Sequence, residues 1–312
     1  MRLYNNGIQA KRMKNTHLEH PEDSVLTGDL SVLDWFIAPG EASLKMDGSP
    51  AIVWGTNPAT GNFFVGTKSV FNKVKIKINE SHDDIDRNHP NPDLAEILHA
   101  CFNHLPRIDG IIQGDFIGFG GDDVFQPNTI TYVFPDVIKE KIIVAPHTVY
   151  TTDTGDLRGC VANMLVDELE SVEGEVLFVR PTVEWEVTDK IKEKVAFAKM
   201  MSQMATYVTS SHATRFKKAV NTIIRNGGVL DDYAISVFAD CDINLVRLWL
   251  LVKSIKEQFM LSFCDDGLFD SYIGAEEIIG EGYVMWNQFG AYKLVEREQF
   301  SCANFNNTKF KV

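Results

Sequence analysis

The chain has 312 residues, 45% of them hydrophobic, and a formal net charge of −13. This length suits one large domain or a domain with a sizeable insertion, and the charge argues against a protein that coats nucleic acid without specificity. No apolar run approaches the roughly 20 residues that span a bilayer, and residues 1–14 lack the apolar core of a secretory signal. We therefore expect a cytoplasmic protein with no membrane partner.

The cysteines are scattered and never form a Cys-x-x-Cys pair. They are Cys101, Cys160, Cys241, Cys264 and Cys302. Their spacing supports neither a zinc site nor a disulfide framework, and reduced thiols agree with a cytosolic setting.

The first half of the chain is predicted to be mainly β-strand. The apolar runs 51–55 and 63–65 flank the turn cluster 57–62, which has the form of a hairpin directly after Lys45. Asn91 then begins a helix as its N-cap, with proline in the first turn. Further strands are expected at residues 110–114, 129–134, 141–150 and 175–180.

The spacing of apolar residues changes from about Thr188. Residues three or four apart between Ile191 and Val208 predict an amphipathic helix. A second helix is expected at about 212–226, ending at two glycines, and a third after an Asp242 cap. Strand character returns at residues 282–286 and 291–295, which have the form of a hairpin.

These elements predict an α+β protein with one mixed domain that carries a helical insertion. The predicted domain consists of residues 1–185 and 270–312, and the predicted insertion of residues 186–269.

Lys45-Met46-Asp47-Gly48 is the first of several segments with the residue types of a phosphoryl-transfer site. A lysine that attacks phosphorus has to be partly neutral, which cationic neighbours and burial favour. The phosphate under attack gathers negative charge, so further lysines and a divalent cation are expected around it. Later segments supply such groups in chain order: Gly66-Thr67-Lys68-Ser69, Gly114-Asp115-Phe116, Glu281-Gly282-Tyr283-Val284 and Tyr292-Lys293-Leu294-Val295.

Each of these residues also has an ordinary structural interpretation. Asp115 suits a strand-end cap, Glu281 suits a turn, and Lys293 suits an edge strand whose lysine reaches solvent. Their occurrence together and in this order favours one site.

The ordered set resembles the covalent nucleotidyltransferase superfamily of ATP-dependent DNA ligases, RNA ligases and mRNA-capping guanylyltransferases. The segments at Lys45, Asp115, Glu281 and Lys293 resemble its motifs I, III, IV and V. The resemblance covers roughly residues 40–150 and 275–295, and it implies an adenylation domain of antiparallel sheets with helices. Lys-x-Asp-Gly-Ser followed by Thr-Lys-Ser is closer to the phage RNA-ligase pattern than to that of DNA ligases.

The resemblance implies a role for each matched residue. Lys45 would be the nucleophile that becomes lysyl-AMP, next to the catalytic-motif residue Asp47. Lys293 would contact the α-phosphate, Glu281 would bind Mg²⁺ or Mn²⁺, and Asp115 would hold the ribose.

Four further residues are expected at the nucleotide. Lys68 is placed near the ribose or phosphates, and Ser43 and Leu44 are placed at the adenine. His147 is the nearest candidate to stack on the base, although a histidine in an apolar strand is also often a core residue.

Two basic clusters are candidates for nucleic-acid contacts. Lys73, Lys75 and Lys77 alternate with Val74 and Ile76, which on a strand would place three ammonium groups on one face; a solvated strand face is the alternative. The predicted helix near 212–226 carries the second cluster, Arg215, Lys217, Lys218 and Arg225.

The chain departs from the family pattern at several points. Aspartate replaces the usual glutamate at Asp115, and Val295 stands where motif V usually has a second lysine. Arg297 compensates only if the strand continues to it. Residues 294–312 are too few for a C-terminal oligonucleotide-binding barrel, so none is expected, and the helical insertion would act as the nucleic-acid clamp instead.

The resulting hypothesis is a monomeric ATP-dependent polynucleotide ligase acting on ends or nicks in DNA, RNA or a hybrid. The alternatives are a capping-type guanylyltransferase and a non-catalytic descendant that binds nucleotide or a partner.

Overall fold

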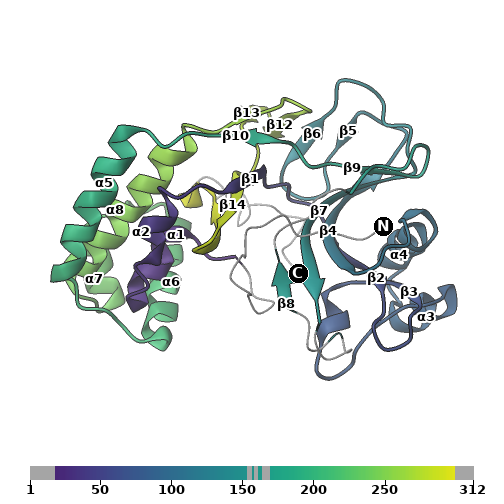
Figure 1. Ribbon diagram of the computed structural model, residues 1–312, viewed down its shortest axis with the longest axis horizontal. Helices are drawn as coiled ribbons and strands as arrows, with labels where there is room; N and C mark the ends of the chain where they lie inside the picture. Colours follow the sequence, from purple (N-terminus) through teal and green to yellow (C-terminus); the bar gives the residue numbers. More distant parts are fainter. Residues whose placement is uncertain (1–17, 153–156, 158–160, 164–168, 299–312) are drawn as a thin grey trace. The chain divides into compact units, whose positions relative to one another are not determined.

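The computed structural model describes residues 18–152, 157, 161–163 and 169–298, and these form two compact units (Figure 1). Unit 1 consists of residues 46–181 and 267–280. Unit 2 consists of residues 18–45, 182–266 and 281–298. Each β-sheet lies within one unit, and the protein is α+β, as the sequence predicted.

Unit 1 is built on a six-stranded sheet with strand order β3-β2-β4-β7-β8, in which β9 also pairs with β7. The neighbours along this order are antiparallel, whereas β9 runs parallel to β7. The strands are β2 (Ala51–Thr56), β3 (Phe63–Gly66), β4 (Ile111–Phe119), β7 (Ile142–Thr151), β8 (Val161–Asn163) and β9 (Val176–Phe178). The predicted hairpin after Lys45 is therefore confirmed as β2 and β3.

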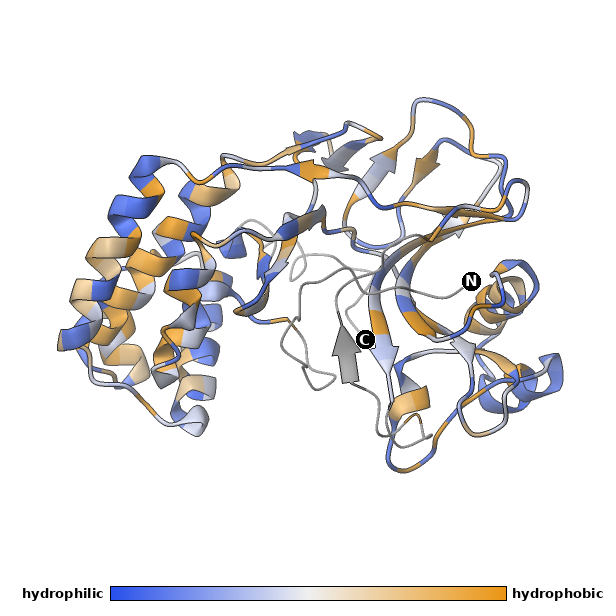
Figure 2. Ribbon diagram, viewed as in Figure 1, coloured by the Kyte–Doolittle hydropathy of each residue, from blue (hydrophilic) through white to orange (hydrophobic). Residues whose placement is uncertain are grey.

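Two helices pack on this sheet, α3 (His82–Asn88) and α4 (Pro92–His104). Asn91 caps α4 as predicted, because its side chain accepts a hydrogen bond from the backbone N–H of Leu94 at 3.0 Å. The core between α4 and the sheet contains Leu98, and Trp54 stacks there on Phe178. Figure 2 shows that α3, by contrast, is almost entirely hydrophilic.

A second sheet in unit 1 has the order β13-β12-β6-β5. Its strands are β5 (Val124–Phe125), β6 (Thr131–Val133), β12 (Asp270–Ile273) and β13 (Glu276–Ile278). Tyr132 on β6 is fully buried and packs edge-on against Phe269. A short 3-10 helix, η2 (Lys68–Phe71), follows β3.

Unit 2 contains the remaining helices. They are α1 (Pro21–Ser24), η1 (Val25–Thr27), α2 (Ser31–Trp35), α5 (Asp189–Met201), η4 (Ser202–Met204), α6 (Ser210–Arg225), α7 (Asp232–Ala239) and α8 (Ile243–Met260). The long helix α8 contacts α1, α5 and α7. Trp35, Phe36 and Phe259 pack edge-on against one another in the core.

The strands of unit 2 form a three-stranded antiparallel sheet, β1-β14-β15, and a pair, β10-β11. They are β1 (Glu41–Leu44), β10 (Val183–Glu184), β11 (Cys264–Asp265), β14 (Tyr283–Asn287) and β15 (Gly290–Leu294). The predicted hairpin of 282–286 with 291–295 is confirmed as β14 and β15.

The structure groups the helical segment differently from the predicted domain boundaries. The sequence predicted residues 186–269 as an insertion, whereas unit 2 joins residues 182–266 to 18–45 and to the segment from 281 onward. The sheet β1-β14-β15 explains this grouping, because α1 and α8 both pack on β15.

Two local predictions are wrong. Residues 73–75 form bends and residues 76–77 are irregular, so there is no strand here, and Lys75 has a φ of 57°, in the left-handed region that interrupts alternation. The helix predicted from 191 to 208 is too long: α5 ends at Met201 and is followed by η4, and Thr209 begins the next helix by capping His212 N. No helix in the described part of the chain is long and apolar enough to cross a membrane.

Candidate functional site

Several of the predicted site residues come together on and next to the sheet β1-β14-β15 of unit 2. Ser43 is in register with Val284, and Val284 is in register with Lys293. Lys45 continues the pairing one residue past β1, since its backbone N–H donates to Gly282 O at 2.8 Å. Because side chains two residues apart share a face, Lys45 projects on the same face as Lys293.

The Lys45 ammonium donates to the carboxylate of Glu281, and the two form an ion pair. Both side chains are mostly covered, with 24% and 14% exposed. Gly282 is required next to this pair: its φ is 127°, and a Cβ there would lie 2.1 Å from Leu294 O. The close approach of β14 to β15 thus places Glu281 against the lysine.

Lys293 is held in a mostly covered position in which burial lowers the pKa of its ammonium, and the charges of Arg297 and Lys45 lower it further. Glu281 and Asp23 oppose this shift without cancelling it. A partly covered lysine whose ammonium form is disfavoured has the property that a contact with an anionic ligand would exploit.

Asp47 lies in unit 1, two residues beyond the lysine. Its backbone N–H donates to the Tyr132 hydroxyl at 2.7 Å, and its carboxylate accepts from Asn128 at 2.5 Å. The backbone of Gly48 lies against β4 so closely that a Cβ would meet Phe116 O at 2.5 Å. In this structure Asp47 and Gly48 therefore fix the course of the chain as it leaves Lys45.

Asp115 and His147 face each other on neighbouring strands of unit 1. Asp115 Oδ1 lies 3.7 Å from His147 Nε2, and the two side chains are 18% and 34% exposed. His147 also lies 3.4 Å from Gln113 Nε2, and its Nδ1 is 2.6 Å from the Thr148 hydroxyl. Gln113, which the sequence did not single out, is itself fixed by the Tyr150 hydroxyl at 2.8 Å.

The lysines near β3 are spread over a loop. Lys68 is exposed at the start of η2, directly after β3, where the sequence placed it. Lys73 and Lys75 are exposed, whereas the Lys77 ammonium donates to Asn88 O at 2.6 Å. The expectation that the three lysines share a strand face is therefore not met.

The basic residues of α6 fall into two groups. Arg215, Lys218 and Arg225 recur at helical spacing along one stripe, and all three are exposed. Lys217 lies off this stripe and forms an ion pair with Glu19, with both N···O distances 2.9 Å.

A family model described as a family of unknown function (DUF6267) matches residues 15–241 and 234–309 of the chain. The chain belongs to the DUF6267 family. The matched residues include Lys45, Glu281 and Lys293, so the site lies inside the region by which the DUF6267 family is defined. No curated protein and no solved structure matched in the other two comparisons.

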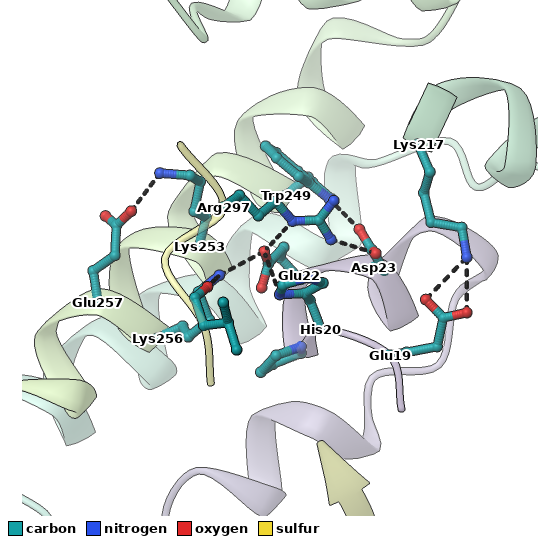
Figure 3. Close-up of polar contacts among 12 residues, drawn as sticks. Glu19, His20, Glu22, Asp23, Lys217, Trp249, Lys253, Lys256, Glu257 and Arg297 are labelled. Carbon is teal, nitrogen blue, oxygen red and sulfur yellow. Dashed lines mark hydrogen bonds and ion pairs between the residues drawn. The ribbon is translucent and has the colours of Figure 1, made fainter. Parts of the chain in front are cut away.

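This DUF6267 protein also contains a buried charge cluster that the sequence did not predict (Figure 3). Arg297 Nε donates to Glu22 Oε1 at 2.9 Å, and its guanidinium also donates to Asp23. Lys256 donates to the same Glu22 oxygen at 2.8 Å. Because β15 ends at Leu294 and Arg297 is committed to these carboxylates, Arg297 does not replace the missing second lysine on the strand face.

The resemblance assigns a divalent metal to Glu281. The described residues contain no group of three or more histidine, cysteine, aspartate or glutamate side chains that could hold a metal. Mg²⁺ is commonly held by one or two carboxylates together with water and substrate phosphates. The single carboxylate of Glu281 fits that mode, and it does not fit a metal enclosed by protein ligands alone.

Proposed function

We propose that this DUF6267 protein is an ATP-dependent polynucleotide ligase that works through a lysyl-AMP intermediate. The observation that carries the proposal is the grouping of three residues at the sheet β1-β14-β15: Lys293 lies on β15, Lys45 directly follows β1, and the Lys45 ammonium is bonded to Glu281, which lies just before β14. The sequence by itself showed only that these residues follow one another along the chain in the order of the family motifs. Their grouping on one small sheet is what a nucleophile, a metal ligand and a phosphate contact require.

The chemistry proposed for Lys45 has three steps. Its amine loses a proton and attacks the α-phosphorus of ATP, forming a P–N bond as the bond to pyrophosphate breaks. A 5′-phosphate oxygen then displaces the lysine, so that AMP moves to the nucleic-acid end. A 3′-hydroxyl finally attacks that 5′-phosphate, forming the phosphodiester bond and releasing AMP.

The ion pair with Glu281 stabilises Lys45 as an ammonium, which is not a nucleophile. The proposal therefore requires Glu281 to leave Lys45 before attack. Mg²⁺ or Mn²⁺, when bound, would supply positive charge to the phosphates, and Glu281 is the residue that would hold it. Lys293 would contact the α-phosphate as negative charge develops.

In unit 1, the proposal assigns Asp115 to the ribose and His147 to the base. Their support is that each side chain is partly exposed and held on an ordered strand. Lys68 is assigned to the ribose or phosphates because it is exposed. Ser43 and Leu44, at the end of β1, remain the candidates for adenine contact through the backbone.

Phosphate contacts with the nucleic acid are assigned to the α6 stripe of Arg215, Lys218 and Arg225. Their shared exposed face supports this assignment. Lys217, bonded to Glu19, is a weaker candidate, as is Lys77. Lys73 and Lys75 remain candidates as exposed loop residues.

The proposal is tested by incubating the protein with α-labelled ATP and Mg²⁺ and measuring label that survives denaturation. Wild type and the control Lys190→Ala, which changes an exposed lysine of α5, should label equally, and Lys45→Ala should not label. A phosphoramidate also predicts label that is lost in acid and kept in base. Equal labelling of Lys45→Ala would refute the assignment.

The same assay separates the alternatives. Label from GTP rather than ATP would identify a capping-type guanylyltransferase, and no label from either nucleotide would favour a non-catalytic descendant. If ATP labels the protein, ligation of nicked duplexes and single strands of DNA, RNA and hybrids identifies the substrate, because 2′-hydroxyl contacts distinguish them.

A further inference from the structure

The buried cluster of Glu22, Asp23, Lys256 and Arg297 (Figure 3) is bonded to the main chain just after the strand that carries Lys293, because Lys256 donates to Val295 O. Glu22 and Lys256 are fully buried, and Arg297 is 5% exposed. Two negative and two positive side chains make the cluster neutral overall. Asp23 is further fixed by Trp249 Nε1, which donates to it at 3.1 Å.

Burying four charged side chains costs free energy, because each of them loses its hydration. Apolar side chains of similar volume often give equal or greater stability, whereas the loss of one partner leaves an unpaired buried charge. A role in fixing geometry accounts for such a cluster better than stability does, and its contacts indicate which geometry it fixes.

Two hydrogen bonds connect the cluster, and the segment that leads into it, to the main chain around Lys293. Lys256 donates to Val295 O at 2.9 Å, two residues after Lys293. The Lys293 N–H donates to Glu19 O at 3.1 Å. Glu19 belongs to the segment that continues into Glu22 and Asp23. Arg297, which follows β15, is bonded to both of these carboxylates, so the segment and the end of β15 are held together.

The charges of the cluster also act on Lys293 and on each other. Burial raises the pKa of Glu22, but Lys256 and Arg297 outweigh burial and leave the pKa of this carboxyl well below its ordinary value. Glu22 therefore stays ionised and keeps both of its cationic partners in place. The Arg297 charge in turn disfavours the ammonium form of Lys293.

We propose that Glu22, Lys256 and Arg297 are positioning residues that hold the backbone of β15 and thereby fix the place of Lys293 beside Lys45. The inference rests on the proposed function only in giving Lys293 a contact with the α-phosphate. The fixed position of the strand is a separate claim that needs no activity to be measured.

The test uses a charge-balanced variant, Glu22→Met with Lys256→Met, which leaves the ion pair of Asp23 with Arg297 intact. Hydrogen exchange at the Lys293 amide, whose partner is Glu19 O, reports how often this bond opens and therefore how firmly the strand is held. We expect about tenfold faster exchange there in a protein that still unfolds cooperatively. The control, Asp232→Asn with Arg247→Met, removes an ion pair (2.7 Å) at the surface between α7 and α8, the helix that carries Lys256, and should leave that amide unchanged.

If the double-methionine variant does not fold, Arg297→Lys gives the same test. It keeps the positive charge but has one nitrogen, whereas the guanidinium uses two nitrogens to bond Glu22 and Asp23. Unchanged exchange at Lys293 in either folded variant would overturn the inference. So would an equal acceleration in the control.

Nucleotide labelling then separates this inference from the proposed function. If wild type labels with ATP, the variant should label about tenfold more slowly at saturating ATP with little change in the half-saturating concentration, because a misplaced Lys293 weakens transition-state contacts. An unchanged labelling rate would contradict the functional part. If wild type does not label at all while exchange still accelerates, the proposed function fails and the positioning role stands.

Discussion

The two units hold their charged candidate residues in different ways. In unit 1, Asp115 and His147 are partly exposed side chains on strands of a sheet whose core is apolar. In unit 2, Lys45 and Lys293 stand on a small sheet fixed by buried ion pairs among residues far apart in the chain. The comparison indicates that an apolar core is enough to hold the strands of unit 1, whereas in unit 2 buried ion pairs are bonded to the main chain next to one strand, β15.

The largest expected effect is on the stability of unit 2. Arg297→Ala leaves Glu22 and Asp23 buried with one cation between them, and we expect a loss of about 3–5 kcal/mol in the free energy of unfolding. Urea unfolding measures it. The matched control Arg247→Ala removes an exposed partner of Asp232 and should cost about 1 kcal/mol or less. Equal losses would show that the buried cluster contributes no more to stability than an exposed ion pair does.

The next effect concerns the contact between Lys45 and Glu281. Glu281→Gln keeps the shape of the side chain and removes the carboxylate that would hold the metal, so we expect labelling by ATP to slow about 100-fold. Glu277→Gln, on exposed β13 of unit 1, is the matched control and should label normally. Faster labelling by Glu281→Gln would instead mean that the ion pair only restrains Lys45.

The smallest effect is a local one in unit 1. Asn91→Ala removes the side chain that accepts from Leu94 N at the start of α4, and we expect a cost of about 1 kcal/mol in unfolding free energy. Asn91→Asp keeps an acceptor and should restore most of it. A cost as large as that of Arg297→Ala would contradict the distinction drawn between the units.

The sequence predicted those parts of the fold that depend on local patterns. The hairpin β2-β3, the Asn91 cap and the hairpin β14-β15 follow from turn residues and apolar runs, and the structure confirms them. Alternation was misleading at residues 73–77, because a loop with a left-handed residue at Lys75 can alternate by chance.

The charge cluster could not be predicted because its partners are remote. Glu22 and Lys256 are separated by 234 residues, and Glu22 and Arg297 by 275. One signal was present: Lys256 falls within the apolar stripe of α8 between Val252 and Phe259, where a lysine is buried only with a partner. Sequence order indicated the candidate site, but not the bond between Lys45 and Glu281.

The central claim is that Lys45 becomes covalently bound to AMP. The most direct measurement is peptide mass mapping of the wild-type protein after incubation with ATP and Mg²⁺. We expect one adenylylated residue, Lys45, with Lys293 unmodified. AMP on any other residue, or strand joining by a protein that never carries AMP, would contradict it.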